Sequence, residues 1–303
     1  MSLWLDTSVI TSEFETTMKF GLIPINVGVP NNASMLALAR KAEDIGLESV
    51  WTFEHTMVPN DYASKYPYSA SGKMPAAPDT NFIDPLIALS AIAAVTSKIR
   101  LGTGVNILPQ TNPLLLAKQA ASLDLVSDGR FELGVGIGWL REEFEALGTP
   151  FERRGARFDD YMTGMRKVWS GETVEHQSDF LNWSGFKSFP IPVQQPLPIV
   201  IGGSKGRTFE RIAKHASGWF APTVDPKEMQ PMLNLLDAAC KDYGRDADEI
   251  EISAMWAPSA GVDAIKAQAD VGVGRLIVPL IALGGGNPLE ALDKLAEDVL
   301  SKF

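Results

Sequence analysis

The sequence is poor in cysteine, in basic charge and in long apolar runs, and each shortage excludes a class of protein. Cys240 is the single cysteine, so no internal disulfide can form, and we expect a reducing, cytoplasmic setting. The formal net charge of −10 at pH 7 disfavours nucleic acid and anionic membranes as main partners, because both bind surfaces rich in Lys and Arg. No apolar run reaches the roughly 18 residues that a membrane span needs.

The chain also lacks the common motifs of metal-dependent enzymes. It has three histidines and no H-x-H, H-E-x-x-H or C-x-x-C pattern, so we expect no metal site. No Walker motif occurs. An organic cofactor is then the natural source of reactivity.

Short apolar runs alternate with helical patterns along most of the chain. Runs such as LGVG and IVIG show no polar alternation, which is typical of parallel strands covered on both faces. Eight strand–helix units predict an α/β fold, a (β/α)8 TIM barrel, with an open doubly wound sheet as the alternative. The expected strands lie near residues 19–24, 49–53, 99–107, 130–136, 198–202, 218–220, 251–255 and 275–279.

Four helix starts carry the same signal, a capping side chain followed by proline at the first helical position. They are Asp84-Pro85, Asn112-Pro113, Asp225-Pro226 and Asn287-Pro288. We expect one domain over residues 18–303, because no second domain is apparent. Residues 1–17 lack the basic-then-apolar order of a signal peptide, and we expect them to form a flexible extension.

Two insertions interrupt the alternation of strands and helices. Residues 60–81 follow the second strand, and residues 171–198 lie between the fourth and fifth strands. Long loops in compact domains are usually functional or mobile. We therefore expect both insertions to pass over the mouth of the barrel.

Candidate functional residues lie just past the strands, because the carboxyl ends of the strands build the active site of such a barrel. His55 follows the second strand, where an imidazole can donate or accept a proton near neutral pH. The alternative is a histidine merely paired with a neighbouring carboxylate such as Glu54. Glu54 itself is expected in the substrate pocket.

Glycines cluster after the third and fourth strands and predict a close approach to bare main chain. Gly102-Thr103-Gly104-Val105-Asn106 would let a planar ring lie against the backbone, although a tight turn without a ligand is the alternative. Residues 134–139 contain Gly134, Gly136 and Gly138 followed by Trp139. The third glycine is one position too close to the second for the dinucleotide-binding pattern G-x-G-x-x-G.

An anion site is predicted after the fifth strand. Gly202, Gly203, Ser204 and Gly206 precede a helix, and free backbone N–H groups at a helix start bind phosphate. An ordinary capped helix is the alternative. The arginines of residues 153–157 fit either a phosphate clamp or a solvated helix entry.

Taken in order, these segments resemble the bacterial luciferase-like monooxygenase superfamily. The similar stretches are residues 99–105, 112–119, 127–139, 141–148 and 198–204, within a resemblance that spans roughly residues 18 to 279. Within the superfamily, the chain is most similar to the branch that uses coenzyme F420.

The resemblance implies a TIM barrel, often dimeric, with an isoalloxazine-type ring across the strand ends. It implies a cis peptide between Gly104 and Val105 behind that ring, His55 at the reacting face and the cofactor phosphate near residues 202–206. One departure matters: Trp139 stands where the F420-dependent sugar-phosphate dehydrogenases carry a carboxylate. Glucose-6-phosphate is therefore not the expected substrate, and Glu142 cannot be assumed to replace that carboxylate.

The resulting hypothesis is an oxidoreductase that binds F420, or alternatively FMN, and exchanges hydride with a small organic substrate. With FMN and O₂ it would oxygenate that substrate. Gly104, Val105 and Asn106 would support the ring, and Gly136 and Gly138 would also contribute to cofactor binding. Trp139 and residues 60–81 would shape the substrate side. A non-catalytic flavin-binding barrel is the alternative. A Schiff-base lyase is disfavoured, because the expected strands carry no lysine at an interior carboxyl end.

Overall fold

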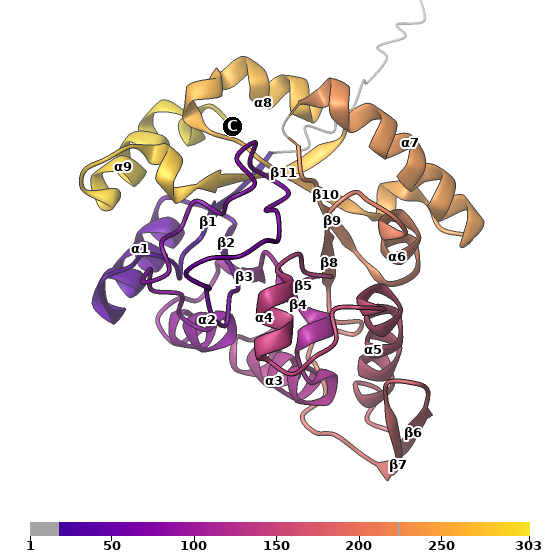
Figure 1. Ribbon diagram of the computed structural model, residues 1–303. Coiled ribbons are helices and arrows are strands. Elements are labelled where there is room, and N and C mark those ends of the chain that lie inside the picture. Colours follow the sequence, from indigo (N-terminus) through magenta and orange to yellow (C-terminus); the bar gives the residue numbers. More distant parts are fainter. Residues whose placement is uncertain (1–17, 224) are drawn as a thin grey trace, which may run out of the picture.

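The computed structural model describes residues 18–223 and 225–303, so the extension expected over residues 1–17 lies outside the described residues. Parallel strands form a closed barrel ringed by helices (Figure 1). The order is β3-β2-β1-β11-β10-β9-β8-β5, and β5 pairs with β3 to close the ring. The predicted TIM barrel is confirmed, and the open sheet is excluded. The barrel strands are β1 (Lys19–Ile23), β2 (Ser49–Thr52), β3 (Arg100–Thr103) with β4 (Asn106–Ile107), β5 (Phe131–Gly136), β8 (Ile199–Gly202), β9 (Gly218–Phe220), β10 (Glu251–Met255) and β11 (Val273–Pro279).

The helices start where the capping signals predicted. In each of the four Asx-Pro junctions the Asp or Asn side chain accepts a backbone N–H of the first turn. None of the described helices combines the length and the apolar character needed to cross a membrane. The helices are α1 (Asn32–Asp44), α2 (Pro85–Ala93), α3 (Pro113–Val126), α4 (Arg141–Ala146), α5 (Arg154–Val168), α6 (Thr208–His215), α7 (Pro226–Asp242), α8 (Gly261–Ala269) and α9 (Pro288–Asp298), with 3-10 turns η1 (Leu108–Gln110), η2 (Ala247–Glu249), η3 (Pro258–Ala260), η4 (Leu280–Leu283) and η5 (Leu300–Lys302).

The barrel strands are buried on both faces, as their continuous apolar runs predicted. All six residues of β5 are buried. A large cluster packs the outward side chains against the helices. A second cluster joins side chains from five different strands, which can meet only inside the barrel; its members are Ile23, Trp51, Val200, Phe220 and Ile277. The lumen is therefore a packed apolar core that supports the mouth from below.

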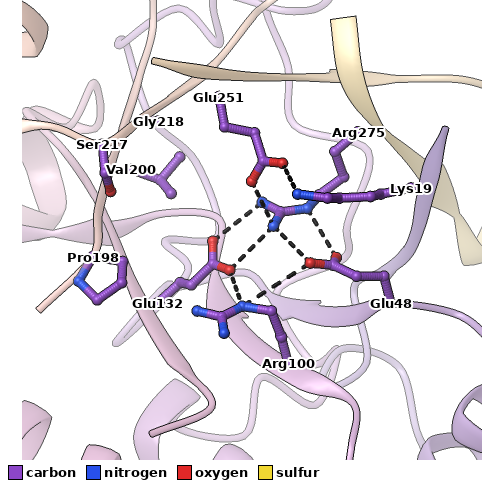
Figure 2. Close-up of a pocket in the computed structure, with 10 residues that line it drawn as sticks. All are labelled: Lys19, Glu48, Arg100, Glu132, Pro198, Val200, Ser217, Gly218, Glu251 and Arg275. Carbon is purple, nitrogen blue, oxygen red and sulfur yellow. Dashed lines mark hydrogen bonds and ion pairs between the residues drawn. The ribbon is translucent and has the colours of Figure 1, made fainter. Parts of the chain in front are cut away.

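A charged network closes the amino-terminal end of the barrel (Figure 2). The Arg275 side chain is 2% exposed, and its Nη2 lies 2.8 Å from Glu48, 3.1 Å from Glu132 and 2.7 Å from Glu251. Lys19 pairs with Glu251, and Arg100 pairs with Glu132. Three cations thus balance three carboxylates around a cavity of about 290 Å³. This end of a barrel contributes stability rather than catalysis.

The first insertion lies against α4, which follows the carboxyl end of β5, because Ala63 N–H and Ser64 N–H donate to Glu142 at 2.7 and 3.1 Å. The second insertion lies elsewhere. It forms the antiparallel hairpin β6 (Val174–Gln177) and β7 (Asn182–Phe186) at the periphery, beside α5 (Figure 1).

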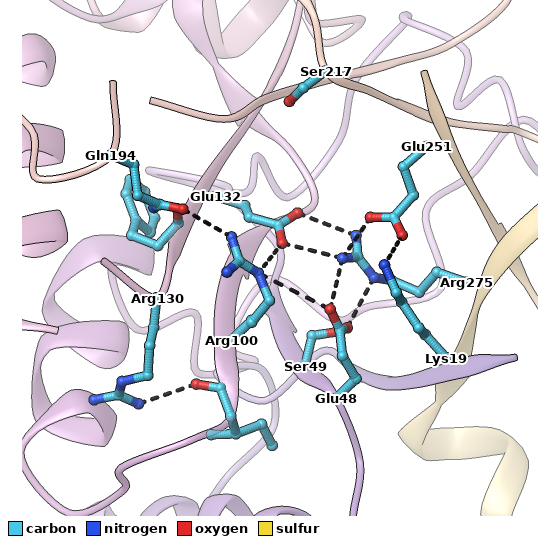
Figure 3. Close-up of polar contacts among 12 residues, drawn as sticks. Lys19, Glu48, Ser49, Arg100, Arg130, Glu132, Gln194, Ser217, Glu251 and Arg275 are labelled. Carbon is cyan, nitrogen blue, oxygen red and sulfur yellow. Dashed lines mark hydrogen bonds and ion pairs between the residues drawn. The ribbon is translucent and has the colours of Figure 1, made fainter. Parts of the chain in front are cut away.

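Beyond the hairpin, the second insertion runs under the barrel. Gln194 accepts a hydrogen bond from Arg100, at the start of β3, at 3.2 Å (Figure 3). It also donates to the Phe131 carbonyl, at the start of β5, at 2.7 Å. The expectation for residues 171–198 is therefore wrong. The reason is topological: a helix that follows a barrel strand returns to the amino-terminal end, so an insertion between α5 and β8 begins and ends there.

Candidate active site

The carboxyl ends of β2, β4, β5 and β8 bring most of the predicted site residues to one rim. The predicted third strand is divided into β3 and β4, and the peptide between Gly104 and Val105 in the gap is cis. The resemblance implied that cis bond, and the structure confirms it. Glu54 is hydrogen-bonded to Asn106 there, and the next residue, His55, packs against Trp139.

His55 is held by a carboxylate that the sequence reasoning missed. Its Nδ1 lies 3.0 Å from Oε2 of Glu143, a residue of the first turn of α4 whose side chain is 2% exposed. Oε1 of Glu143 accepts the backbone N–H groups of Thr56 and Met57 at 2.6 and 3.3 Å. The ring therefore has a carboxylate partner, but it is Glu143 and not the adjacent Glu54.

Glu54 turns toward the segment that follows the cis peptide. Its Oε1 accepts Asn106 Nδ2–H at 2.8 Å, and its Oε2 accepts the N–H of Ile107. Burial raises the pKa of Glu54 to about 8, and the charges of Glu143 and Asp84 act in the same direction against the Ile107 hydrogen bond. A carboxylic acid near neutral pH therefore lies at the base of the mouth.

Asn106 is left with an unused polar atom. The residue is 3% exposed, and its Oδ1 is buried without a partner among the described residues. A neutral Glu54 carboxyl group donates a hydrogen bond of its own. Asn106 can accept it if the side-chain amide is turned over, so that Oδ1 rather than Nδ2 faces Glu54. In either orientation, one polar atom of the Asn106 amide has no protein partner.

At several of the glycines, other atoms of the protein occupy the space that a side chain would need. A Cβ on Gly134 would lie 1.6 Å from the Thr103 carbonyl oxygen, and one on Gly102 would lie 2.3 Å from the Trp51 ring. A Cβ on Gly136 or Gly202 would lie 2.7 or 3.1 Å from the Val105 side chain. The close approach that the sequence predicted is real, and at these positions it is an approach between strands.

Three other glycines of the site, Gly138, Gly203 and Gly206, have backbone conformations that favour glycine. Gly138 has φ +77°, and a Cβ there would meet Ile107 and Phe144. Gly203 and Gly206 have φ +98° and +62°, and a Cβ on Gly206 would meet no atom within 4 Å. The left-handed conformation alone accounts for Gly206, because the space beside it is open.

The loop from β8 to α6 holds residues of the predicted anion site. It holds Gly203, Ser204 and Gly206, and α6 begins at Thr208. The Thr208 hydroxyl donates to the Lys205 carbonyl at 2.7 Å. Unlike the four Asx-Pro helices, α6 has no side-chain cap. Backbone N–H groups at a helix start can bind an anion.

An aromatic wall covers the other side of His55. Its ring meets Phe82 and Trp139 edge to face, with centroids 5.6 and 5.9 Å apart. Tyr62 and Tyr66 from the first insertion meet Trp139 in the same way, at 5.6 and 5.2 Å. Trp139 therefore joins the insertion to the catalytic candidate.

Glu142 does not take the place of the carboxylate that the sugar-phosphate dehydrogenases carry at the position of Trp139. Its Oε1 is engaged by the backbone of Ala63 and Ser64. Although burial opposes the change, hydrogen bonds from Ser64 and from the Ala63 backbone lower the pKa of Glu142 to about 2. Glu142 is thus an ionised residue that holds the insertion in place.

Comparison with known proteins gives a consistent assignment. The family model described as luciferase-like monooxygenase matches residues 18–295. An uncharacterized protein of Mycobacterium tuberculosis is 31% identical over 275 residues, which cover 88% of this chain and 94% of the relative. The 5,10-methylenetetrahydromethanopterin reductase of Methanolobus tindarius is 26% identical, with 87% and 71% covered. The oxygenase component of the flavin-dependent trigonelline monooxygenase of Acinetobacter baylyi is 28% identical, with 72% and 56% covered.

Solved structures support the fold. The coenzyme F420-dependent tetrahydromethanopterin reductase of Methanopyrus kandleri superposes with a TM-score of 0.75 at 18% identity, covering 94% of this chain and 99% of that one. A monooxygenase of Streptomyces bottropensis superposes with a TM-score of 0.72 at 23% identity, with the same coverage. At such identities the likeness concerns architecture alone.

Proposed function

Since the chain belongs to the luciferase-like monooxygenase family, we propose that it is an oxidoreductase that holds coenzyme F420, or alternatively FMN, at the mouth of the barrel. The cofactor supplies hydride chemistry with a small organic substrate, or oxygenation when it is FMN and O₂ is present. The oxygenase component of a flavin-dependent monooxygenase is among the similar proteins, and the sequence resembles the branch of the superfamily that uses F420, so both cofactors remain within the proposal.

The observation that carries the proposal is the unpartnered amide atom of Asn106 beside the Gly104–Val105 peptide. Leaving a buried polar atom without a partner costs about 1–3 kcal/mol. Flavin and deazaflavin rings alternate N–H and C=O groups along one edge. Such an edge satisfies the Asn106 amide in either orientation, so the residues present fit a ring of this kind.

The anion site supports the same assignment. F420 and FMN both carry phosphate, and the uncapped start of α6 with Gly203, Ser204 and Gly206 suits a phosphate. Gly136 and Gly202 would act indirectly, by making room for the Val105 side chain beneath the ring. Gly138 would act in the same indirect way, through its packing on Ile107.

His55 is the proposed proton donor or acceptor for the substrate. Its Nδ1 faces Glu143, so Nε2 is the ring nitrogen left for the substrate. Trp139 and the first insertion would exclude water and shape the substrate side. Neutral Glu54 would hold residues 106 and 107 in place below the ring.

Titration of the purified protein with F420 and with FMN tests the proposal. We expect at least one of them to bind with a Kd well below 100 µM, which corresponds to about −5.5 kcal/mol. Weaker binding of both would refute the assignment. Tight binding without faster reoxidation of the reduced cofactor by any candidate substrate would favour a non-catalytic flavin-binding barrel.

His55→Ala tests the role of the histidine. Turnover should fall by about 10²–10⁴-fold, the usual contribution of a general acid or base, while cofactor affinity changes little. His176→Ala is the matched control, because His176 also pairs with a carboxylate, Asp160, but lies in the hairpin beside α5. Equal losses of turnover and affinity in His55→Ala would make His55 a binding or structural residue.

A further inference from the structure

Three nitrogen atoms lie within hydrogen-bond distance of the two carboxylate oxygens of Glu143. Two of those nitrogens are the backbone N–H groups of Thr56 and Met57, which can only donate, and both reach Oε1. Oε2 is left for Nδ1 of His55 at 3.0 Å. An ionised carboxylate only accepts hydrogen bonds, so this arrangement favours the hydrogen on Nδ1.

The His55 ring has little freedom to exchange its two nitrogens. Its side chain is 9% exposed, and Phe82 and Trp139 meet it edge to face at interplanar angles of 88° and 80°. Within the described part of the chain, Nε2 makes no hydrogen bond and is not completely buried. One ring nitrogen is therefore committed to the protein and the other is accessible.

We propose that Glu143 is a positioning residue that holds neutral His55 as the Nδ1–H tautomer, so that Nε2 presents a lone pair to the substrate. When Nε2 takes a proton, Nδ1–H remains bonded to Glu143, and the carboxylate stabilises the imidazolium. The proton returns from the same atom in the reverse direction. The inference rests on the proposed function only for the role of the substrate, since the tautomer is a property of the protein alone.

Glu143→Gln is the sharpest perturbation, because it changes one oxygen to an N–H₂ group without changing the shape. The amide oxygen must stay with Thr56 and Met57, since two backbone donors converge there. The amide nitrogen then faces Nδ1 as a donor, and the neutral ring has to move its hydrogen to Nε2. The accessible nitrogen loses its lone pair and can no longer accept a proton.

Nitrogen-15 NMR of the protein labelled at histidine reads the tautomer directly. The chain has three histidines, so His176→Gln and His215→Gln assign the signals. At pH 8.5, where an ordinary imidazole is neutral, we expect Nδ1–H for His55 in the unsubstituted protein and Nε2–H in Glu143→Gln. Glu142→Gln is the matched control: the same change one residue earlier touches Ala63 and Ser64 rather than His55, and should leave the tautomer unchanged.

Turnover with the cofactor found by titration gives the second readout. Glu143→Gln should lower kcat by about 10²–10⁴-fold with less than about a threefold change in cofactor Kd. An Nε2–H signal in the unsubstituted protein would overturn the proposal, whether or not the variant folds. An unchanged tautomer in a folded Glu143→Gln protein would do the same. If the tautomer changes as expected and neither F420 nor FMN binds, the positioning role stands and the proposed function fails.

Discussion

Replacing Glu54 by glutamine tests the claim that a neutral carboxyl group lies at the base of the mouth. In the folded protein burial raises the pKa of Glu54 from 4.5 to about 8. Between those two values the unfolded chain releases a proton that the folded protein keeps. The unfolding free energy of the unsubstituted protein should therefore fall as pH rises through this range. Glutamine cannot ionise, so Glu54→Gln should not show that fall.

The size of the effect follows from the shift. About 3.5 pH units at about 1.4 kcal/mol each give an upper bound of about 5 kcal/mol. Glu54 is only partly buried, and solvent reduces the shift, so we expect about 2–4 kcal/mol between pH 5 and pH 8.5. Urea unfolding of both proteins at pH 5, 7 and 8.5 measures the difference.

Glu142→Gln provides the contrast, because the pKa of Glu142 is lowered to about 2. A lowered pKa adds stability that is complete above the unfolded value and is lost only in more acid solution. The difference between Glu142→Gln and the unsubstituted protein should therefore stay constant from pH 5 to pH 8.5. A constant difference for Glu54→Gln as well would mean that Glu54 is ionised in the folded protein, and the reasoning would be refuted.

Two further substitutions test the barrel itself, each by urea unfolding. Arg275→Met leaves three carboxylates without their buried cation, and we expect a loss of about 3–5 kcal/mol; a loss below about 1 kcal/mol would show that the network does not stabilise the fold. Gly134→Ala places a methyl group 1.6 Å from the Thr103 carbonyl oxygen, and we expect a loss of about 3 kcal/mol or more. Gly274→Ala is its control, because the nearest atom there is 3.8 Å away; similar losses at both positions would contradict the packing argument.

Local chemistry made much of the fold predictable. A cap such as Asn112 needs only the N–H groups of the next two or three residues, so it can be identified without knowing the rest of the chain. Continuous apolar runs likewise depend only on neighbouring residues, and they indicated strands that are covered on both faces. The break between β3 and β4 had no such local signal beyond glycine, and only the resemblance implied the cis peptide there.

Contacts between distant residues could not be predicted in this way. His55 and Glu143 are 88 positions apart, and Glu54 and Asn106 are 52 apart. Glycine-rich strand ends indicated a close approach, yet not its partner: the Trp51 ring accounts for Gly102. Such partners depend on how the strands are staggered around the barrel, which the pattern of residue types does not encode.

The first turn of α4 shows how the mouth is built with a tryptophan, rather than a carboxylate, at position 139. Glu142 holds the backbone of residues 63 and 64, and Glu143 holds His55 with the two residues after it. Both carboxylates are thus engaged with the loop that follows β2, and Trp139 packs on the same loop. An acidic residue at Trp139 would add a charge beside these two carboxylates and remove the aromatic contact to His55. Under the proposed function, Nε2 of His55 would exchange the proton with a substrate on this side, and the aromatic wall would favour substrates with an apolar surface facing it.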